Sequence, residues 1–163
     1  MKTGNCNSQA QEAAEQPNFR GIRDIHQQVL VLQEKTLIAV PQDVDVHPIS
    51  MMSIPCRDQS LEKDKGNPIY LGIAETELCL CCEESGEQPI LKLKERDIME
   101  LYRNQKAEKS FVFYRNATGN ISTFESAAYP GWFICSSVEK GKPITITKDV
   151  GKNNIAFYFD PRD

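Results

Sequence analysis

Residues 124–136 read FESAAYPGWFICS, and they include the only tryptophan of the chain, Trp132. Proline fixes φ and glycine tolerates positive φ, so Pro130 and Gly131 predict a sharp turn between the apolar residues on either side. We therefore expect a corner between two strands, the second of which begins at Trp132. The large indole ring, buried in the core, would anchor this corner.

Short β-like runs lie along the rest of the chain and are separated by clusters of turn residues such as 64–68 and 151–154. They predict an all-β protein, because about eleven strands follow one another at close spacing. The expected strands are 29–32, 36–40, 49–54, 69–73, 78–82, 90–94, 111–114, 122–127, 132–136, 144–147 and 157–159.

One segment departs from this pattern. Asp97 and Glu100 have the spacing of a helix N-cap and its reciprocal partner, and apolar residues follow at helical intervals. The sequence therefore predicts a single short helix over residues 97–102.

Tight hairpin-like units open near Val29, Ile69 and Phe111, with a recurrence of about 40 residues. Three similar thirds predict a β-trefoil of about 12 strands with pseudo-threefold symmetry, in which a closed barrel leaves no exposed sheet edge. An open sandwich fits the same strand pattern, because the recurrence is one of spacing and not of residue identity.

Length and composition suit one soluble globular domain. The chain has 163 residues, of which 40% are hydrophobic and 26% charged, and its formal net charge is −4. Lysines and arginines are scattered and form no basic stripe, so we expect no nucleic-acid partner. No run approaches the roughly 18 apolar residues that cross a bilayer, so we expect no membrane anchor.

The first residues predict a flexible leader. Residues 1–24 are polar and rich in Gln, Asn, Ala and Glu, and they cannot bury enough apolar surface to offset their ordering entropy. They contain no apolar stretch that could form the core of a signal peptide, so we expect synthesis in the cytosol. Residues 25–163 are then expected to form the folded domain.

Six cysteines are present, and in a chain made in the cytosol we expect free, mostly buried thiols. Residues 79–82 include a Cys-x-x-Cys pair, a pattern also found in redox centres and zinc sites. Here the pair lies inside an alternating strand and has no second ligand pair, which favours packing. The sequons at Asn116 and Asn120 are expected to be turn residues without glycosylation.

No group of residues indicates catalysis. His26 and His47 lie in polar segments without a nucleophile motif nearby, and paired acidic residues such as Glu83 and Glu84 suit a solvated face. A barrel with long polar loops suits the presentation of a surface to another protein, so we expect a binding function. We expect neither enzyme activity nor a cofactor or metal.

The segment 124–136 resembles the signature of the interleukin-1 cytokine family. The shared positions are Phe124, Ser126, Ala127, Pro130, Phe133, Ile134 and Cys135. Ser136 replaces the usual threonine, and Ile144 supplies the aliphatic residue expected later. Further segments look like the interleukin-36 branch, namely residues 37–41, 66–73, 86–95 and 97–102.

This resemblance implies a β-trefoil that acts as an extracellular ligand and has no catalytic activity. The implied partners are the interleukin-36 receptor chain, which binds first, and the interleukin-1 receptor accessory protein, which is then recruited to start NF-κB and MAP-kinase signalling. The resemblance implies a pro-inflammatory agonist that is monomeric when free. It would be made as a cytoplasmic precursor and released by unconventional secretion.

The resemblance also gives the leader a role. Interleukin-36 cytokines become fully active after proteolysis about nine residues before an aliphatic-x-Asp motif. Ile22-Arg23-Asp24 matches this motif, which places the new N-terminus at Ala13. We expect the form that begins at Ala13 to signal far more strongly than the full chain, because the leader would hinder the receptor contact. An activating protease is therefore an expected partner.

Two loops correspond by position to the receptor-recruiting loops of the family, residues 57–67 and 148–154. Their expected receptor-binding residues are Arg57, Asp58, Glu62, Lys63, Asp64, Lys65, Lys148, Asp149, Lys152, Asn153 and Asn154. The signature 124–136 is expected to close the trefoil and to touch neither loop.

Alternatives to agonism stay open. Leu30 stands where agonists of the branch usually have tryptophan, and Ala156 stands where many have Asp or Asn, although the acidic segment 62–66 has the length typical of agonists. A receptor antagonist or suppressive cytokine of the same family is therefore the main alternative. A β-trefoil protease inhibitor is a more remote one, and a lectin-like trefoil would repeat a Gln-x-Trp motif that this chain lacks.

Overall fold

The computed structural model describes residues 16–62 and 64–162. These residues form thirteen strands, one α-helix and one 3₁₀ helix. The strands are β1 (Asn18–Asp24), β2 (Gln28–Gln33), β3 (Thr36–Pro41), β4 (Met51–Pro55), β5 (Asn67–Ile73), β6 (Leu78–Ser85), β7 (Gln88–Glu95), β8 (Val112–Thr118), β9 (Ile121–Ser126), β10 (Phe133–Cys135), β11 (Lys142–Pro143), β12 (Thr145–Thr147) and β13 (Phe157–Pro161). The helices are α2 (Ile98–Arg103) and η1 (Lys109–Phe111).

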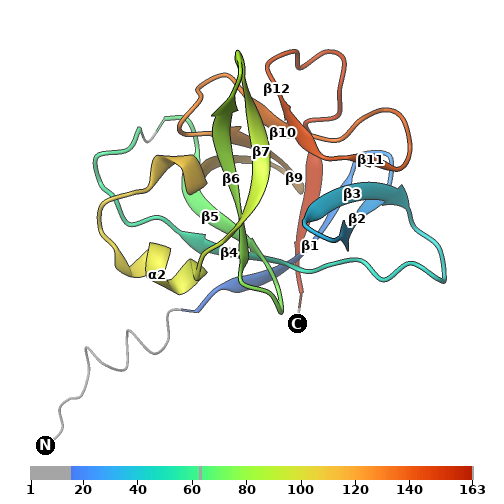
Figure 1. Ribbon diagram of the computed structural model, residues 1–163, viewed down its shortest axis with the longest axis horizontal. Coiled ribbons are helices and arrows are strands. Elements are labelled where there is room, and N and C mark those ends of the chain that lie inside the picture. Colours follow the sequence, from blue (N-terminus) through green and yellow to red (C-terminus); the bar gives the residue numbers. More distant parts are fainter. Residues whose placement is uncertain (1–15, 63, 163) are drawn as a thin grey trace, which may run out of the picture.

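Six of the strands close into a barrel. Antiparallel pairs join β1 to β4, β4 to β5, β5 to β8, β8 to β9, β9 to β13, and β13 back to β1. The start of β1 and the end of β13 lie together at the lower end of the molecule (Figure 1). Because the ring is closed, its strands leave no unpaired edge to which another chain could add.

Three hairpin pairs complete the fold. They are β2–β3, β6–β7 and β10–β12, and the short β11 adds to β3. The chain therefore runs three times through a barrel strand, a hairpin pair and a second barrel strand, which is the β-trefoil arrangement. The predicted all-β trefoil with one short helix is confirmed, and all eleven expected strands are present, with β1 and β11 in addition.

Two of the three predicted unit boundaries were wrong, and the one near Ile69 agrees with the start of β5. Equivalent barrel strands begin at Asn18, Asn67 and Ile121, the starts of β1, β5 and β9. Val29 instead lies in the first hairpin pair, and Phe111 precedes the last barrel strand of the second unit. Tight turns connect barrel and hairpin strands alike, so turn spacing alone does not separate the two kinds of strand.

The predicted leader was too long. Residues 18–24 form β1, which pairs with β13, β4 and β2, and only residues 1–15 of the leader lie outside the described residues. The sequence of β1 is polar because most of its side chains reach the surface, and only Ile22 and Asp24 are fully buried. Composition therefore does not reveal a strand that receives its partners from distant parts of the chain.

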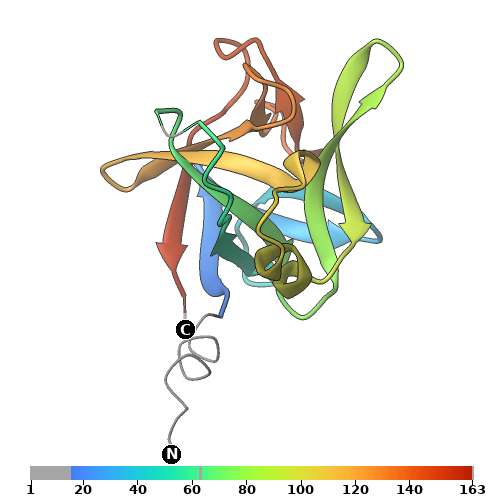
Figure 2. The same ribbon diagram turned by 90° about the vertical axis from the view of Figure 1, so that its left-hand side faces the viewer.

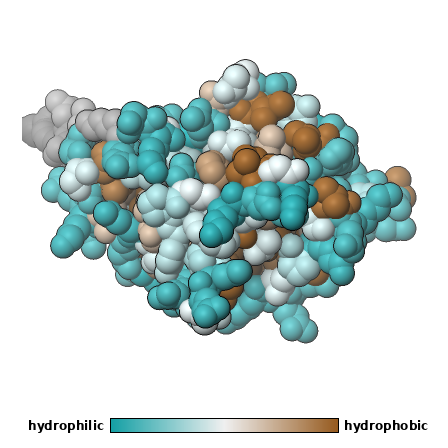
Figure 3. Space-filling view, turned by 90° about the horizontal axis from the view of Figure 1, so that it is seen from above, coloured by the Kyte–Doolittle hydropathy of each residue, from teal (hydrophilic) through white to brown (hydrophobic). Residues whose placement is uncertain are grey.

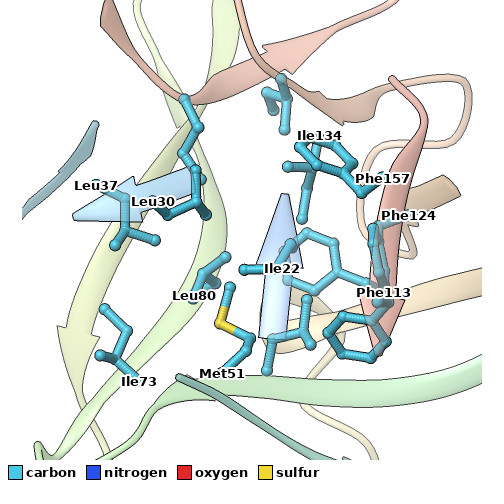
Figure 4. Close-up of a cluster of buried hydrophobic side chains, with 14 of the residues drawn as sticks. Ile22, Leu30, Leu37, Met51, Ile73, Leu80, Phe113, Phe124, Ile134 and Phe157 are labelled. Atoms are coloured by element: carbon cyan, nitrogen blue, oxygen red, sulfur yellow. The ribbon is translucent and has the colours of Figure 1, made fainter. Parts of the chain in front are cut away.

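The main core lies inside the barrel and under the hairpins. Figure 4 shows side chains from all three units pointing toward one another, among them Ile22, Leu80 and Phe157. The Phe124 ring lies 6.2 Å from that of Phe157 and 5.1 Å from that of Phe159, centroid to centroid. The three units thus share one core, and no unit buries its apolar face alone.

Helix α2 covers a second, smaller core. The Asp97 carboxylate accepts a hydrogen bond from the Met99 amide at 2.9 Å, so the predicted N-cap is confirmed. Ile98 and Leu101 are buried in a cluster with Tyr70 of β5. The helix therefore closes one side of the sheet, and its C-terminal end faces the loop between β4 and β5.

We expect Phe124→Ala to lower the free energy of unfolding by about 3–5 kcal/mol, because its ring has 0% exposure and fills the shared core. Urea unfolding followed by circular dichroism measures this loss. The matched control is Phe19→Ala, because Phe19 is 43% exposed in β1 and should cost less than about 1 kcal/mol. Equal losses in the two variants would contradict a single aromatic core.

Candidate functional site

Arg57 begins the loop between β4 and β5, the first predicted receptor loop. Its Nε donates to the Tyr102 carbonyl at 2.9 Å, and its Nη2 donates to the Arg103 carbonyl at 2.6 Å. Its guanidinium also lies 4.7 Å from the centroid of the Tyr102 ring. Arg57 therefore caps the C-terminal end of α2, where a cation is favourable, and ties the loop to the helix.

Asp58 fixes the next turn of the same loop. One carboxylate oxygen accepts hydrogen bonds from the amide and hydroxyl of Ser60 at 2.9 and 2.6 Å, and the other accepts the Ala107 amide at 2.8 Å. The Ala107 hydrogen bond, followed by those of Ser60, lowers the pKa of Asp58 to about 2. Asp58 is therefore an anionic anchor that holds the loop against the segment after α2.

The far half of this loop is tied to the strand corner. Lys65 Nζ lies 3.1 Å from a carboxylate oxygen of Glu125 and 3.8 Å from one of Glu62. The hydrogen bond with Glu125 is the largest cause of the raised pKa of Lys65. Gly66 follows with φ +126°, and a Cβ there would lie 2.6 Å from the Arg115 carbonyl oxygen, so only glycine fits.

Two charged side chains of the loop are left exposed. Glu62 and Asp64 reach solvent, whereas Leu61 between the anchors is only 6% exposed and packs on the smaller core. Lys63, the remaining predicted residue, lies outside the described residues. The first loop is therefore a braced segment that presents a short acidic stretch.

The second predicted loop, between β12 and β13, presents both charged and apolar groups. Lys148, Asp149 and Lys152 are exposed, and Lys152 Nζ lies 3.6 Å from an Asp149 carboxylate oxygen. Val150 between them is 50% exposed, and Asn153 is half-buried. Figure 3 views the molecule from the top of Figure 1 and shows a mainly hydrophilic face with separate hydrophobic patches. Such a mixed surface suits contact with another protein.

Asn154, predicted as a receptor-binding residue, lies below the surface of this loop. It is 7% exposed, and its backbone exchanges hydrogen bonds of 3.0 and 2.9 Å with Ser136. Its Nδ2 lies 3.3 Å from the Ser136 hydroxyl and 3.5 Å from a carboxylate oxygen of Asp24. The side chain satisfies buried oxygens and thereby fastens the end of the loop to the barrel.

Asp24, of the aliphatic-x-Asp motif, is the centre of this buried polar cluster. Its carboxylate accepts the amides of His26 and Gln28 at 2.9 Å, the Gln28 side-chain amide at 2.8 Å and the Ser136 hydroxyl at 2.7 Å. Ile22, two residues earlier on the same face of β1, enters the hydrophobic core. The motif therefore marks the inward face of the first barrel strand, besides any role in processing.

The corner itself turns where it was predicted to turn. Gly131 has φ +88° and the Trp132 amide donates to the Tyr129 carbonyl at 3.1 Å, which makes residues 129–132 a type II turn. A carboxylate oxygen of Glu125 accepts the Gly131 amide at 2.8 Å and closes the turn. The following strand, β10, begins at Phe133 and not at Trp132.

This corner contacts both predicted loops, which contradicts the expectation that it touches neither. Glu125 pairs with Lys65 of the first loop, and Lys148 of the second loop lies 5.8 Å from the centroid of the Trp132 ring. In addition, β10 pairs with β12, which leads into the second loop. Loops far apart in the sequence meet one turn because neighbouring barrel strands bring their ends together.

Trp132 was expected to be buried, but it is only partly buried. Its ring packs against the main core from outside and carries Lys148 over its face. Four residues of the segment 124–136 have 0% exposure, namely Phe124, Ser126, Cys135 and Ser136. Trp132 follows the turn directly, where the chain has not yet re-entered the sheet, so one face of the indole stays at the surface.

The described cysteines Cys56, Cys79, Cys81, Cys82 and Cys135 are free and buried, as expected. Burial raises the pKa of Cys79 and Cys82 to about 12 and that of Cys81 and Cys135 to about 11, which disfavours the reactive thiolate.

Within residues 16–62 and 64–162, no three metal-binding side chains are grouped, and no helix has the length and apolar character to span a membrane.

Comparison with known proteins identifies the family of this chain. The model of the family described as Interleukin-1 / 18 matches residues 45–159. The chain belongs to the interleukin-1 family. It is 50% identical to human interleukin-36 alpha over 139 residues, which cover 85% of the chain and 88% of that relative. It is 43% identical to mouse interleukin-36 beta over 145 residues, which cover 88% and 79% respectively.

A solved structure agrees with this assignment. The NMR structure of interleukin-36 alpha, described as a pro-inflammatory cytokine, superposes with a TM-score of 0.78 at 47% sequence identity. The superposition covers 91% of this chain and 96% of the chain in the NMR structure. The resemblance to the interleukin-1 family and its interleukin-36 branch, inferred from the corner and nearby segments, is thus confirmed. Members of this family are cytokines and not enzymes.

We expect an NMR titration of the Asp58 carboxyl carbon to have its midpoint near the pKa of about 2. The folded-state pKa of Asp58 lies below the usual 3.8. Asp58 therefore makes its full contribution to stability at pH values above 3.8, and this contribution is lost as the pH falls through about 2. The Ala107 amide signal should shift with the same midpoint. A midpoint near 3.8 would contradict the anchoring hydrogen bonds.

We expect Trp132→Ala to lower the free energy of unfolding by about 1–3 kcal/mol, less than Phe124→Ala, because only part of the ring leaves water on folding. Urea unfolding measures both losses. The Lys148 side-chain signals in NMR should shift in Trp132→Ala, since the ring beneath the ammonium is removed. A loss equal to that of Phe124→Ala would indicate a fully buried indole.

Proposed function

We propose that this chain is a secreted pro-inflammatory cytokine. It binds the interleukin-36 receptor chain and recruits the interleukin-1 receptor accessory protein, which starts NF-κB and MAP-kinase signalling. The observation that carries this proposal is the similarity to interleukin-36 alpha over most of both chains, since that relative is described as a pro-inflammatory cytokine. The braced loops are consistent with a binding function.

In this proposal the predicted loop residues divide into two groups. Arg57, Asp58, Lys65 and Asn154 hold the loops in place through the contacts described above, and they act as positioning residues. The exposed groups that could touch a receptor chain are Glu62, Asp64, Lys148, Asp149 and Lys152, with the half-buried Asn153 beside them. A loop that is braced before binding loses less conformational entropy in the complex, which favours affinity.

The leader is proposed to be removed by an activating protease before Ala13. Because β1 is a barrel strand and starts at Asn18, a cut inside it would remove hydrogen-bonded partners of β13 and β4. A cut before Ala13 leaves β1 whole, with a short extension. We propose that the precursor is cytoplasmic, that the active form is released without a signal peptide, and that it is a monomer when free.

A reporter assay in cells that carry both receptor chains tests this function. We expect the form that begins at Ala13 to induce NF-κB far more strongly than the full chain. Charge reversal at the exposed positions, as in Asp149→Lys or Glu62→Lys, should reduce potency by roughly tenfold or more if the contact is central to the interface. Asp45→Lys is the matched control, since Asp45 is exposed in the β3–β4 loop and should keep full potency.

The same assay decides between the proposed function and its alternative. Blockade of a known agonist, without induction, would identify a receptor antagonist or suppressive cytokine. Equal potency of the full chain and of the form that begins at Ala13 would reject the role of the leader. Absence of both induction and blockade would reject receptor binding by this chain.

A further inference from the structure

A cavity opens at the end of the barrel where β1 begins and β13 ends. Its volume is about 320 Å³, and its lining comes from β1, β4, β5, β8 and β13. Figure 2 shows these two strand ends side by side, and Arg20 of β1 pairs with Pro161 of β13. The cavity adjoins the end of the first loop at Asn67, but none of the exposed loop groups proposed to contact a receptor lines it.

Two arginines enter this cavity and share one aromatic ring. The guanidinium carbon of Arg20 lies 5.3 Å from the centroid of Phe159, and that of Arg115 lies 5.0 Å from it. Arg115 Nε is fixed by a 2.9 Å hydrogen bond to the Ser122 hydroxyl. Burial, and then the charge of Arg20, lower the pKa of Arg115, which agrees with two cations held close together.

No carboxylate in the described part of the chain balances these two charges. Neither Arg20 nor Arg115 takes part in an ion pair there, and no Asp or Glu lines the cavity. Arg20 Nε is buried without a hydrogen-bond partner. By contrast, Arg23 on the same strand pairs with Asp160, and Arg96 pairs with Glu108. A buried donor and two like charges are costly unless an anion joins them.

We propose that this cavity binds a tetrahedral oxyanion, a phosphate or sulfate group, between Arg20 and Arg115. Guanidinium groups match such oxygens with paired, charge-assisted hydrogen bonds. Ser53, Asn18 and Asn67 line the same cavity and add neutral polar groups around the anion. The volume accommodates the oxyanion with part of the molecule that carries it, so the ligand is a phosphorylated or sulfated small molecule, headgroup or sugar.

The test is a titration of the full chain with inorganic phosphate and with sulfate, at constant ionic strength set by chloride. NMR signals of the arginine Nε–H groups should shift and saturate with both anions. Arg20→Gln and Arg115→Gln should each weaken binding by roughly tenfold or more, since each removes charge-assisted hydrogen bonds. Arg23→Gln is the matched control, because it removes one positive charge from the same strand and should leave the affinity unchanged.

Further arms identify the source of the anion. They use a heparin disaccharide, soluble inositol trisphosphate, and vesicles with or without a phosphoinositide. Arg115→Lys keeps the charge but loses the planar fork, so intermediate binding by a variant with native circular dichroism supports the site even if Arg115→Gln folds poorly. No saturable shift, or equal binding by the Arg20→Gln/Arg115→Gln double variant, would overturn the proposal whatever the reporter assay shows.

Discussion

The pairing of β1 with β13 holds the trefoil closed. It joins the first and last of the described strands. Without it, the six barrel strands would form an open sheet with five strand pairings, and with it they form a closed ring. An open sheet of this size would leave two edges and a core exposed at the seam. With the ring closed, side chains from all three trefoil units meet in one interior, and Phe124, Phe157 and Phe159 pack there against one another.

A buried carboxylate reinforces this closure. Asp24 ends β1, and it gathers donors from its own turn, from the end of the corner at Ser136 and from the last loop at Asn154. A buried charge is tolerated only where several donors converge, so the same bonds specify where these segments must lie. The barrel seam and the second loop are thus positioned by one side chain.

The corner at residues 124–136 is the second connecting element. Its Glu125 holds the turn at Gly131 and the first loop at Lys65, while Trp132 lies under Lys148 of the second loop. The segment with the family signature is therefore also a brace between the two loops proposed to meet a receptor. Its buried residues pack in the core, and its exposed residues contact the loops. One short segment therefore stabilises both the core and the loops.

Elements that follow from local chemistry could be predicted from the residues alone. Alternating apolar residues predicted eleven strands, Asp97 predicted the helix cap, and Pro130-Gly131 predicted the turn, since each depends on a residue and its near neighbours. Which elements meet depends on long-range pairing in the folded chain. Polar β1 looked like a leader because its longest pairing is with β13, at the far end of the chain. Asn154 looked exposed because it is buried by Asp24 of β1 and by Ser136, which follows β10. The corner was expected to touch neither loop, but it contacts both, because barrel closure brings strand ends together. That proximity depends on long-range pairing and not on spacing along the chain.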